Sequence, residues 1–282
     1  MKLLSALSLC AILAVPSLAS AGAAVAPAAR LTKVTWHGQA AFEIVTPGGK
    51  VLLVDPWLQN PLNPTKNPVD AIKKVDYILI THGHFDHLGD AVAIGKKTGA
   101  RLIASFELGQ QLVRLAGYPE KQIGFDTLGN AGGELSFDNG EFSVVFVPAV
   151  HSSGLDVPDA SGKPGALVFG GNPVGYVIKI KNGPTIYHTG DTAYYSDMAL
   201  IGDMGIDLGL INIGGHFGME PDAAALAAKV VKAKLVVPHH FKSFPILTQD
   251  PKGFFDALDK MNIAHHEMKP GETLVFDGKT RK

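Results

Sequence analysis

The stretch Thr81-His82-Gly83-His84-Phe85-Asp86-His87 decides the fold of this 282-residue chain. It follows directly on residues 76–80, a nearly continuous apolar run that predicts a buried strand. We expect a helix after Leu88, so the stretch occupies a strand-to-helix loop. Loops of this kind lie outside the carboxyl ends of strands, where open α/β structures place their sites.

The polar residues of this stretch form the pattern H-x-H-x-D-H, at positions 82, 84, 86 and 87. Three imidazoles and a carboxylate this close together would include strong repulsion if every histidine were charged. A divalent cation removes that repulsion, because it binds neutral imidazole and carboxylate together. The alternative is a polar loop with chance histidines. We therefore predict a metal site at this loop.

Further ligand candidates follow later predicted strands. His151 comes after the strand at 142–147, Asp191 after the strand at 185–188, and His240 after the strand at 235–237. Any one of them alone is more often a hydrogen-bonded surface residue. Together with the first four they predict seven side chains that converge at the carboxyl ends of strands, which is enough for two metal ions.

The rest of the chain alternates between strand and helix signals. Strands are expected at residues 31–36, 41–45, 51–54, 76–80, 101–104, 142–147, 175–180, 185–188, 208–213, 235–237, 265–267 and 273–276, and helices at 89–98, 107–116, 221–232 and 251–261. Two βα-rich halves of similar length predict two sheets packed face to face with helices outside. Residues 152–173 are rich in Gly and Pro and are expected to form a loop, as a lid or substrate wall.

The first 30 residues differ from the rest. A positive start, an apolar run and the small-residue pattern ending at Ala21 predict a secretory signal peptide over residues 1–21. An Ala/Pro-rich spacer is expected at 22–30 and the domain that carries the predicted metal site at 31–282, in the periplasm or outside the cell. The only cysteine, Cys10, would leave with the signal. No other segment is long and apolar enough to cross a membrane.

Composition limits the partners. Hydrophobic residues make up 46% of the chain and charged residues 18%, which is typical of a globular protein. The formal net charge of −1 shows no basic excess, so a nucleic-acid surface is not expected. The expected partner is a small-molecule substrate. An anionic substrate stays open, because a metal site supplies its own positive charge.

Several further motifs give the chain a family resemblance that runs from about Val34 to Phe276. They are Leu53-Val54-Asp55-Pro56, Thr81 to Gly89, Ala149-Val150-His151-Ser152-Ser153, Gly171 to Tyr176, Tyr187 to Thr192, Gly214 to Met219 and Pro238-His239-His240-Phe241. With them the chain resembles the metallo-β-lactamase superfamily. Within it, the chain is similar to small bacterial metal-dependent hydrolases related to ascorbate-phosphate lactonases and N-acyl-phosphatidylethanolamine phospholipases D. The resemblance implies an α/β fold, the αββα four-layer sandwich.

The resemblance also implies the role of each ligand. One ion would be held by His82, His84 and His151, the other by Asp86, His87 and His240, with Asp191 bridging the two. His239 competes with His240, but the family pattern of Pro, any residue, His and an aromatic selects His240. Two zinc ions are expected, with manganese or iron as the alternative, because sites made of nitrogen and oxygen ligands discriminate poorly among these metals.

Two cations that share a water lower its pKa and stabilise negative charge in the transition state, which favours hydrolysis. Asp86 is expected to orient that hydroxide or accept its proton. Asp55 would orient ligands from behind, although a turn-forming Asp before Pro is an equal alternative. His216 follows two glycines and is a candidate substrate contact or leaving-group acid, with a structural hydrogen bond as the alternative.

The chain departs from the family near its start. Where relatives often show Gly-His-Ser or Gly-His-Ala, this chain has Gly38-Gln39-Ala40 with a histidine at His37. A substrate contact from that position is therefore in doubt. His188 is expected to be structural, and His265 and His266 to be ordinary strand residues.

The substrate class stays open at this stage. Asp191 replaces the cysteine of one large class of zinc β-lactamases and indicates the general hydrolases, which act on ester-type bonds such as phosphodiesters and lactones. The alternatives are an iron-dependent dioxygenase of the same fold, a zinc β-lactamase-like amide hydrolase, and a metal-binding protein without turnover. A homo-oligomer is also compatible with the sequence.

Overall fold

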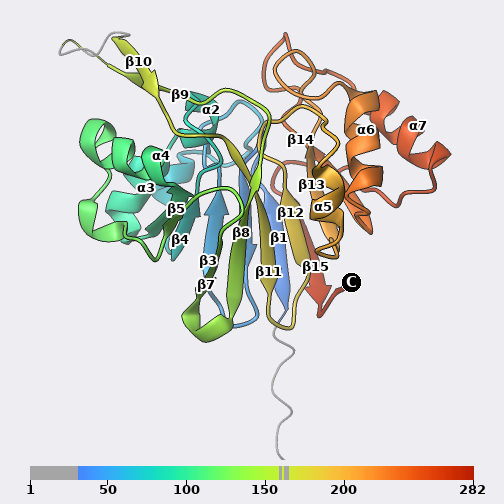
Figure 1. The fold of residues 1–282 in the computed structure, drawn as a ribbon, viewed down its shortest axis with the longest axis horizontal. Coiled ribbons are helices and arrows are strands. Elements are labelled where there is room, and N and C mark those ends of the chain that lie inside the picture. The colour runs from blue at the N-terminus through green and yellow to red at the C-terminus, as the bar shows by residue number, and fades with distance from the viewer. Residues whose placement is uncertain (1–30, 159–160, 162–164) are drawn as a thin grey trace, which may run out of the picture.

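Two β-sheets packed face to face form the centre of the computed structural model, which describes residues 31–158, 161 and 165–282 (Figure 1). The predicted signal peptide and spacer lie outside the described residues. The first sheet has eight strands in the order β16 (Thr280–Arg281), β15 (Thr273–Asp277), β1 (Thr32–Trp36), β2 (Phe42–Val45), β3 (Val51–Val54), β4 (Tyr77–Leu79), β5 (Arg101–Ser105) and β6 (Leu128–Gly129).

The second sheet has six strands in the order β14 (Leu235–His239), β13 (Leu208–Asn212), β12 (Thr185–His188), β11 (Val174–Ile180), β8 (Phe142–Pro148) and β7 (Glu134–Phe137). A separate two-stranded hairpin consists of β9 (Gly154–Val157) and β10 (Ala166–Phe169). The prediction that residues 152–173 form only a loop was therefore wrong, because they contain two strands of four residues each. The many Gly and Pro residues of this segment had favoured a loop.

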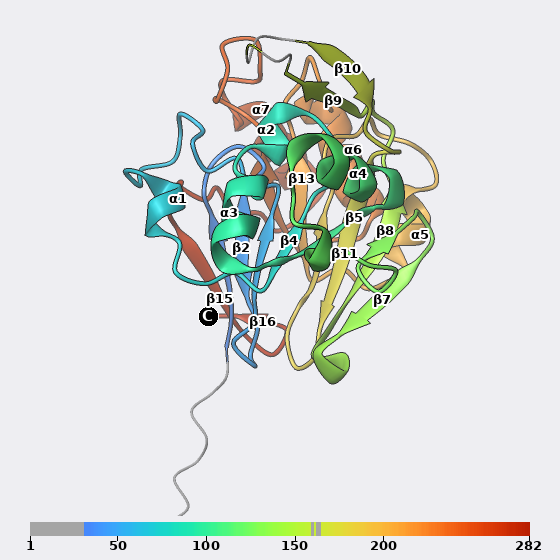
Figure 2. The same cartoon turned by 90° about the vertical axis from the view of Figure 1, so that its left-hand side faces the viewer.

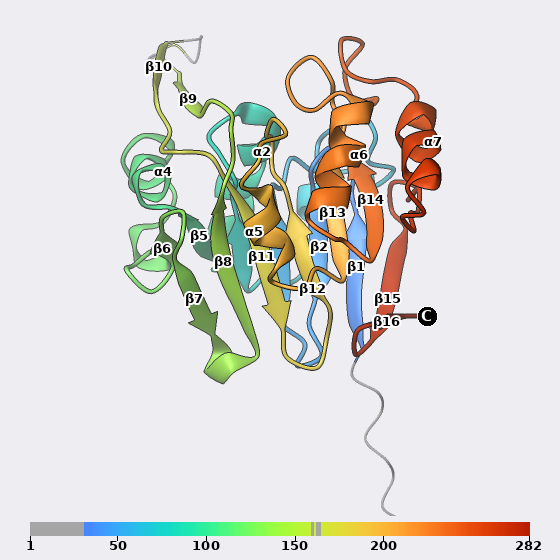
Figure 3. The ribbon, with the colours of Figure 1, turned by 45° about the vertical axis from the view of Figure 1, so that its right-hand side comes forward.

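Helices cover the outer faces of both sheets. α3 (Ala91–Thr98) and α4 (Phe106–Gln111) lie against the first sheet (Figure 2), and α5 (Met198–Gly202) and α6 (Pro221–Val230) lie over the second (Figure 3). α7 (Lys252–Lys260) packs beside α6, and the short helices α1 (Pro68–Ala71) and α2 (Phe85–Leu88) complete the set. The four layers confirm the predicted αββα sandwich. Among the described residues, none of the helices combines the length and apolar character needed to span a bilayer.

Strand β4 shows how the layers are held. Tyr77 and Leu79 belong to the core between the sheets, whereas Ile78 belongs to the core beneath the helices. Successive side chains of a strand point to opposite faces, so a run that is apolar at every position fits a strand buried on both sides. The continuous apolar pattern of residues 76–80 follows from this position in the middle of the sandwich.

Strand direction brings the ends of several strands to one edge. β3, β4, β5 and β6 are parallel neighbours in the first sheet, as are β12, β13 and β14 in the second. β8 runs in the same direction as β12, because both are antiparallel to β11. The carboxyl ends of parallel strands meet at the same edge, so the segments that follow β4, β8, β12 and β14 can converge.

Some boundaries differ from those predicted. The helix expected at 89–98 begins at Ala91, after the separate turn α2, and the helix expected at 107–116 becomes α4 followed by a π-helical turn at Leu112–Ala116. The strand expected at 265–267 was wrong, because only a single parallel bridge joins His265 to Val236. The helices at Glu120–Gln122 and Asp138–Gly140 are single 3₁₀ turns.

Candidate metal centre

The H-x-H-x-D-H motif lies in the loop between β4 and α2. His84 is the N-cap of α2, and Asp86 and His87 lie within that helical turn. His82, Asp86 and His87 are buried, and His84 is half-buried. The loop is pressed against its neighbour from the second sheet: Gly190 has φ of 58°, and a Cβ there would come within 2.9 Å of the Thr81 Cβ. Only glycine allows this approach without strain.

All seven predicted ligands come together in space. Their donor atoms form three groups in which every atom lies within 4.8 Å of the others: His82, His84 and His151; His82, His87 and Asp191; and Asp86, His87 and His240. The second group shares members with the predicted sites of both ions. The structure therefore places the seven side chains as two adjoining clusters with Asp191 between them.

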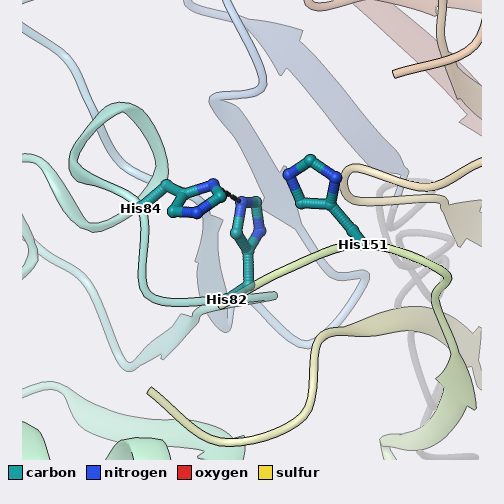
Figure 4. Close-up of side chains that lie close together, drawn as sticks. All are labelled: His82, His84 and His151. Carbon is teal, nitrogen blue, oxygen red and sulfur yellow. Dashed lines mark hydrogen bonds between the residues drawn. The ribbon is translucent and has the colours of Figure 1, made fainter. Parts of the chain in front are cut away.

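The first cluster contains three imidazoles from two chain segments, and Figure 4 shows their rings gathered around one space. His82 Nε2 and His84 Nδ1 are 3.0 Å apart. The His151 ring is 5.0 Å from the His82 ring and 5.1 Å from the His84 ring, nearly perpendicular to both. Nitrogen atoms that converge in this way suit a shared cation.

The Asp191 carboxylate occupies the position of a bridge. Its Oδ2 atom is 3.1 Å from His240 Nε2, 3.3 Å from His87 Nε2 and 3.7 Å from His151 Nε2. Its Oδ1 atom accepts a hydrogen bond of 2.5 Å from the Asn212 side-chain amide. One oxygen is thus held by the protein, and the other is directed at both clusters.

Asn212 was missed by the sequence analysis. It ends β13, between the strands that lead to Asp191 and His240, and its Oδ1 atom accepts a hydrogen bond from the Gly214 backbone N–H. Its position at the carboxyl end of a strand buried along its whole length was the available signal.

Asp55 orients the cluster from behind, and it also forms the predicted turn before Pro56, since its φ is 44° and its carbonyl accepts from Trp57 N–H at 2.8 Å. The carboxylate is fully buried and accepts hydrogen bonds from the Thr81 backbone N–H at 2.8 Å and the Thr81 hydroxyl at 2.7 Å. It also lies 2.8 Å from His87 Nδ1. A carboxylate at Nδ1 fixes the proton there and leaves Nε2 as the atom that faces the ligands.

Gln39 provides a second support that the sequence did not predict. Its side-chain amide donates a 2.7 Å hydrogen bond to Asp86 Oδ2, and its Oε1 atom accepts one from the Ser243 hydroxyl. Its backbone carbonyl accepts from the His240 backbone N–H at 3.1 Å. Gln39 therefore contacts two members of one cluster. Gln39, which stands where relatives often have histidine, is therefore buried behind a ligand.

Charge and burial divide the histidines into two kinds. Burial lowers the pKa of His82, His84 and His151, which favours the neutral form that binds metal. Burial also acts to lower the pKa of His240, but Asp191 and Asp86 outweigh it and raise that pKa to about 9. Burial acts to raise the pKa of Asp86, yet His87 and His240 lower it to about 2.

Whether metal ions fit the cluster can be judged from the donor atoms that have no hydrogen-bond partner. Within the part of the chain that the structure describes, His87 Nε2, His151 Nε2 and His240 Nε2 are buried and make no hydrogen bond of acceptable geometry, although the Asp191 carboxylate is close. Buried polar atoms are normally paired, and an unpaired one is costly. Three such nitrogens around one carboxylate fit divalent ions held by nitrogen and oxygen ligands.

The other histidines next to a ligand in sequence or space, and those near the C-terminus, lie outside the cluster. His240 belongs to the cluster, whereas His239 is buried behind it, 3.2 Å from the Thr189 hydroxyl and stacked on His188. His188 is structural, as expected: its Nε2 atom is 2.9 Å from the Ala40 carbonyl oxygen, and its Nδ1 atom accepts from Gly190 N–H. His265 and His266 pair with Asp259 and Glu272, far along the chain.

His216 and His37 are not among the clustered donors. His216 is exposed, and its ring packs edge-on against Phe217. His37 is half-buried, and burial lowers its pKa. The role suggested for His216 as a substrate contact or acid therefore stays a prediction.

A cavity of about 720 Å³ opens directly on the cluster. Five of the predicted ligands line it: His84, Asp86, His151, Asp191 and His240. The other walls come from α2, from the β9–β10 hairpin and from the segments after β13 and β14. The hairpin is joined to the motif loop by Ser153, whose hydroxyl accepts from Gly83 N–H and donates to the Gly170 carbonyl. The segment predicted as a substrate wall does border the site.

This fold and this site define a class. The family model described as "Beta-lactamase superfamily domain" matches residues 50–241. The chain belongs to the metallo-β-lactamase superfamily, as its motifs had indicated.

Among its curated relatives, the chain is 48% identical over 250 residues to a UPF0173 metal-dependent hydrolase of Thermodesulfovibrio yellowstonii, covering 87% of this chain and 92% of the relative. It is 49% identical over 247 residues to a UPF0173 metal-dependent hydrolase of Anaeromyxobacter dehalogenans, covering 87% of each. Its activity class is therefore that of a metal-dependent hydrolase.

Solved structures agree with this placement. The metallo hydrolase Igni18 of Ignicoccus hospitalis matches with a TM-score of 0.74 and 31% identity, over 87% of this chain and 98% of that one. An isothiocyanate hydrolase from Delia radicum gut bacteria shares the fold, with a TM-score of 0.63 and 20% identity over 87% of this chain and 99% of that one.

Proposed function

We propose that this chain is a binuclear metal hydrolase in which a hydroxide between two ions attacks an ester-type bond, such as a phosphodiester or a lactone. The observation that carries this proposal is the position of Asp191 Oδ2, within 3.7 Å of donor nitrogens from both clusters. His82, His84 and His151 would hold one ion, and Asp86, His87 and His240 the other. When bound, such ions lower the pKa of a shared water and stabilise developing negative charge.

The side chains around the attacking water have different roles. Asp86 lies at the wall of the cavity, and Gln39 holds its Oδ2 atom with a 2.7 Å hydrogen bond. A carboxylate fixed in this way can orient the attacking water or accept its proton. Gln39 and Asp55 hold Asp86 and His87 in place from the opposite side.

Metal content is the first test. We propose two zinc ions per chain, with manganese or iron as the alternative, because nitrogen and oxygen ligands bind all three. Elemental analysis of the purified protein measures this directly. Less than half an equivalent of any transition metal per chain, after supply of metal during growth, would contradict the proposal.

Turnover is the second test. Bis(4-nitrophenyl) phosphate, lactones and a chromogenic β-lactam are offered to the wild type, to Asp86→Ala and to Asp70→Ala, a control on the exposed helix α1. We expect metal-dependent hydrolysis that Asp86→Ala reduces by about two orders of magnitude or more and that Asp70→Ala leaves unchanged. Preference for the β-lactam would instead indicate an amide hydrolase, and oxygen uptake with a thiol persulfide a dioxygenase.

We also propose that the chain is exported and processed near Ala21. The sequence pattern of residues 1–21 supports this, and those residues lie outside the part that the structure describes. Amino-terminal sequencing of the protein from the periplasm or medium of an expressing bacterium tests it. A mature start at Gly22 is expected, and an intact Met1 in the cytoplasm would contradict it.

A further inference from the structure

The walls of the cavity above the metal centre are mostly apolar. Phe85, Leu167, Phe217 and Ile246 line it, although each of these side chains is more than half exposed. Isolated exposed apolar residues are common on protein surfaces, but a contiguous group around a functional site marks a binding surface. These four come from four separate segments and meet only here.

One wall is built on stacked aromatic rings. Trp57 stacks on Phe244 with 5.4 Å between the ring centroids, and Phe85 packs edge-on against both. Aromatic contacts of this geometry hold the rings in fixed positions. The wall is therefore formed before any ligand arrives, as expected for a small-molecule site.

A second wall is the β9–β10 hairpin, and its two faces differ. Leu155 and Val168 are cross-strand partners that pack on the core beneath the helices. Asp156 and Leu167 are the next cross-strand pair, and both line the cavity. Gly154 gives Leu167 its room, since a Cβ there would come within 2.6 Å of a Leu167 methyl carbon. The hairpin thus presents Leu167 to the site on an anchored support.

The charges around the cavity disfavour a ligand that carries several negative charges. Among the described residues that line it, none is a Lys or an Arg, and Asp156 adds a carboxylate at the hairpin wall. Groups that carry several negative charges are usually bound by Arg or Lys. The lining residues therefore offer an anionic group no lysine or arginine, and its charge could be balanced only at the metal centre.

We infer that the substrate is an ester-type compound whose non-reacting part is an uncharged, apolar chain or ring, bound between Leu167 of the hairpin and Ile246 of the segment after β14. This inference rests on the proposed function and names the substrate class of the same site. The metal centre takes the polar scissile group, and the apolar walls take the remainder. Nucleotide-like and polyanionic esters are poor substrates.

The test uses pairs that share a reacting group and differ in the remainder. γ-Octalactone is compared with γ-butyrolactone, and octyl 4-nitrophenyl phosphate with thymidine 5′-(4-nitrophenyl phosphate). Burial of one methylene group is worth about a fourfold change in kcat/KM. Because the walls are partly exposed, we expect at least about a tenfold preference for the apolar member of whichever pair is hydrolysed. Equal rates, or a preference for the polar member, would overturn the inference.

Variants of exposed aliphatic residues locate the effect. Leu167→Ser and Ile246→Ser should reduce the preference severalfold, because kcat/KM should fall more for γ-octalactone than for γ-butyrolactone. Leu200→Ser removes a side chain that is 67% exposed on α5, outside the cavity, and should change nothing. If Leu200→Ser had the same effect as Leu167→Ser, the preference would not come from this cavity.

A binding measurement separates this inference from the proposed function. The uncharged dye Nile red should bind the metal-loaded wild type saturably, be displaced by decan-1-ol, and bind several-fold more weakly to Leu167→Ser but not to Leu200→Ser. This result would support the apolar site even if no ester were hydrolysed, in which case the proposed function alone would fail. Binding that ignores Leu167 would overturn the inference even in an active enzyme.

Discussion

Individual ligands of the metal centre are held by partners on the side away from the cavity. Asn212 holds one oxygen of Asp191, Asp55 lies against His87 Nδ1, and Gln39 donates to Asp86. Partners of this kind fix the tautomer and direction of a ligand, and their loss typically weakens metal binding about 10- to 100-fold. The precision of the site therefore depends on residues that would touch no metal themselves.

Gln39 gives a prediction at this scale. Gln39→Ala removes the amide that donates to Asp86 Oδ2, so we expect the ion held by Asp86, His87 and His240 to bind about 10- to 100-fold more weakly. Competition with a coloured chelator measures the two affinities separately. The affinity of the His82, His84 and His151 cluster should change little.

Two further variants control for general damage. Ser243→Ala removes only the outer partner of Gln39 and should have a smaller effect. Gln39→His keeps a ring N–H near Asp86 and should recover part of the affinity. Gln39 would be a packing residue and not a positioning one if Gln39→Ala lowered the affinity for both ions equally. The same would follow if Gln39→His bound metal no more tightly than Gln39→Ala.

At the scale of elements, strand ends carry the site, and this is why the sequence revealed so much of it. Residues 76–80 are apolar because β4 is buried on both faces, and the polar residues that follow had to lie in a loop. His151, Asp191 and His240 were found in the same way, as ligand-type residues just after apolar strands. The predicted sandwich and the seven clustered side chains follow from that one pattern.

What the sequence did not reveal depends on contacts between distant segments. Ser153 and Asn212 are common polar residues, and only the fold shows that one joins the hairpin to the motif loop and the other holds Asp191. The hairpin was missed because the exposed positions of β10 carry the apolar residues Leu167 and Phe169. The strand therefore shows no alternation of apolar and polar residues in the sequence. The departure at Gln39 was visible, but its role as a support for Asp86 was not.

Asp207 connects elements of the second sheet and gives a pH prediction. Its buried carboxylate precedes β13, accepts from Thr185 N–H at 2.9 Å, and pairs with Lys234 at 2.8 Å and Lys279 at 3.2 Å. Burial acts to raise the pKa of Asp207, but these hydrogen bonds and lysines lower it below the ordinary value of 3.8. A carboxyl with a lowered native pKa adds stability above its unfolded pKa and loses it as the pH falls.

We therefore expect the free energy of unfolding to fall between about pH 5 and pH 3 more steeply in the wild type than in Asp207→Asn. Urea unfolding at a series of pH values measures this. Asp203→Asn, which alters the exposed ion pair with Lys232, is the control and should keep the wild-type slope. Parallel curves for the wild type and Asp207→Asn would show that Asp207 does not contribute to acid sensitivity.

At the scale of the whole molecule, the metal centre joins the two halves of the sandwich. Four of its side chains follow β4 of the first sheet, and three follow β8, β12 and β14 of the second. Ions held between them would bind the folded state and not the unfolded chain. A ligand present at 100 times its dissociation constant stabilises a protein by about 2.7 kcal/mol.

Removal of metal should therefore destabilise the whole fold and not one loop. Because about 1 kcal/mol shifts the Tm of a domain of this size by about 2–4 °C, we expect chelation to lower the Tm by roughly 5–10 °C. Differential scanning calorimetry with and without a chelator measures it. Asp191→Asn should lose most of the difference, and a wild type whose Tm ignores the chelator would contradict a metal-joined sandwich.

The separation between the ligands and the apolar walls also bears on how such a protein diversifies. Leu167 and Ile246 lie on exposed segments and belong to neither core cluster, whereas the residues that support the ligands are buried in the sandwich. Mutations at the walls therefore change which compound is accepted at little expense in folding, while the chemistry is inherited intact. Proteins that descend from one ancestral gene can therefore accept different substrates after a few substitutions at these exposed positions.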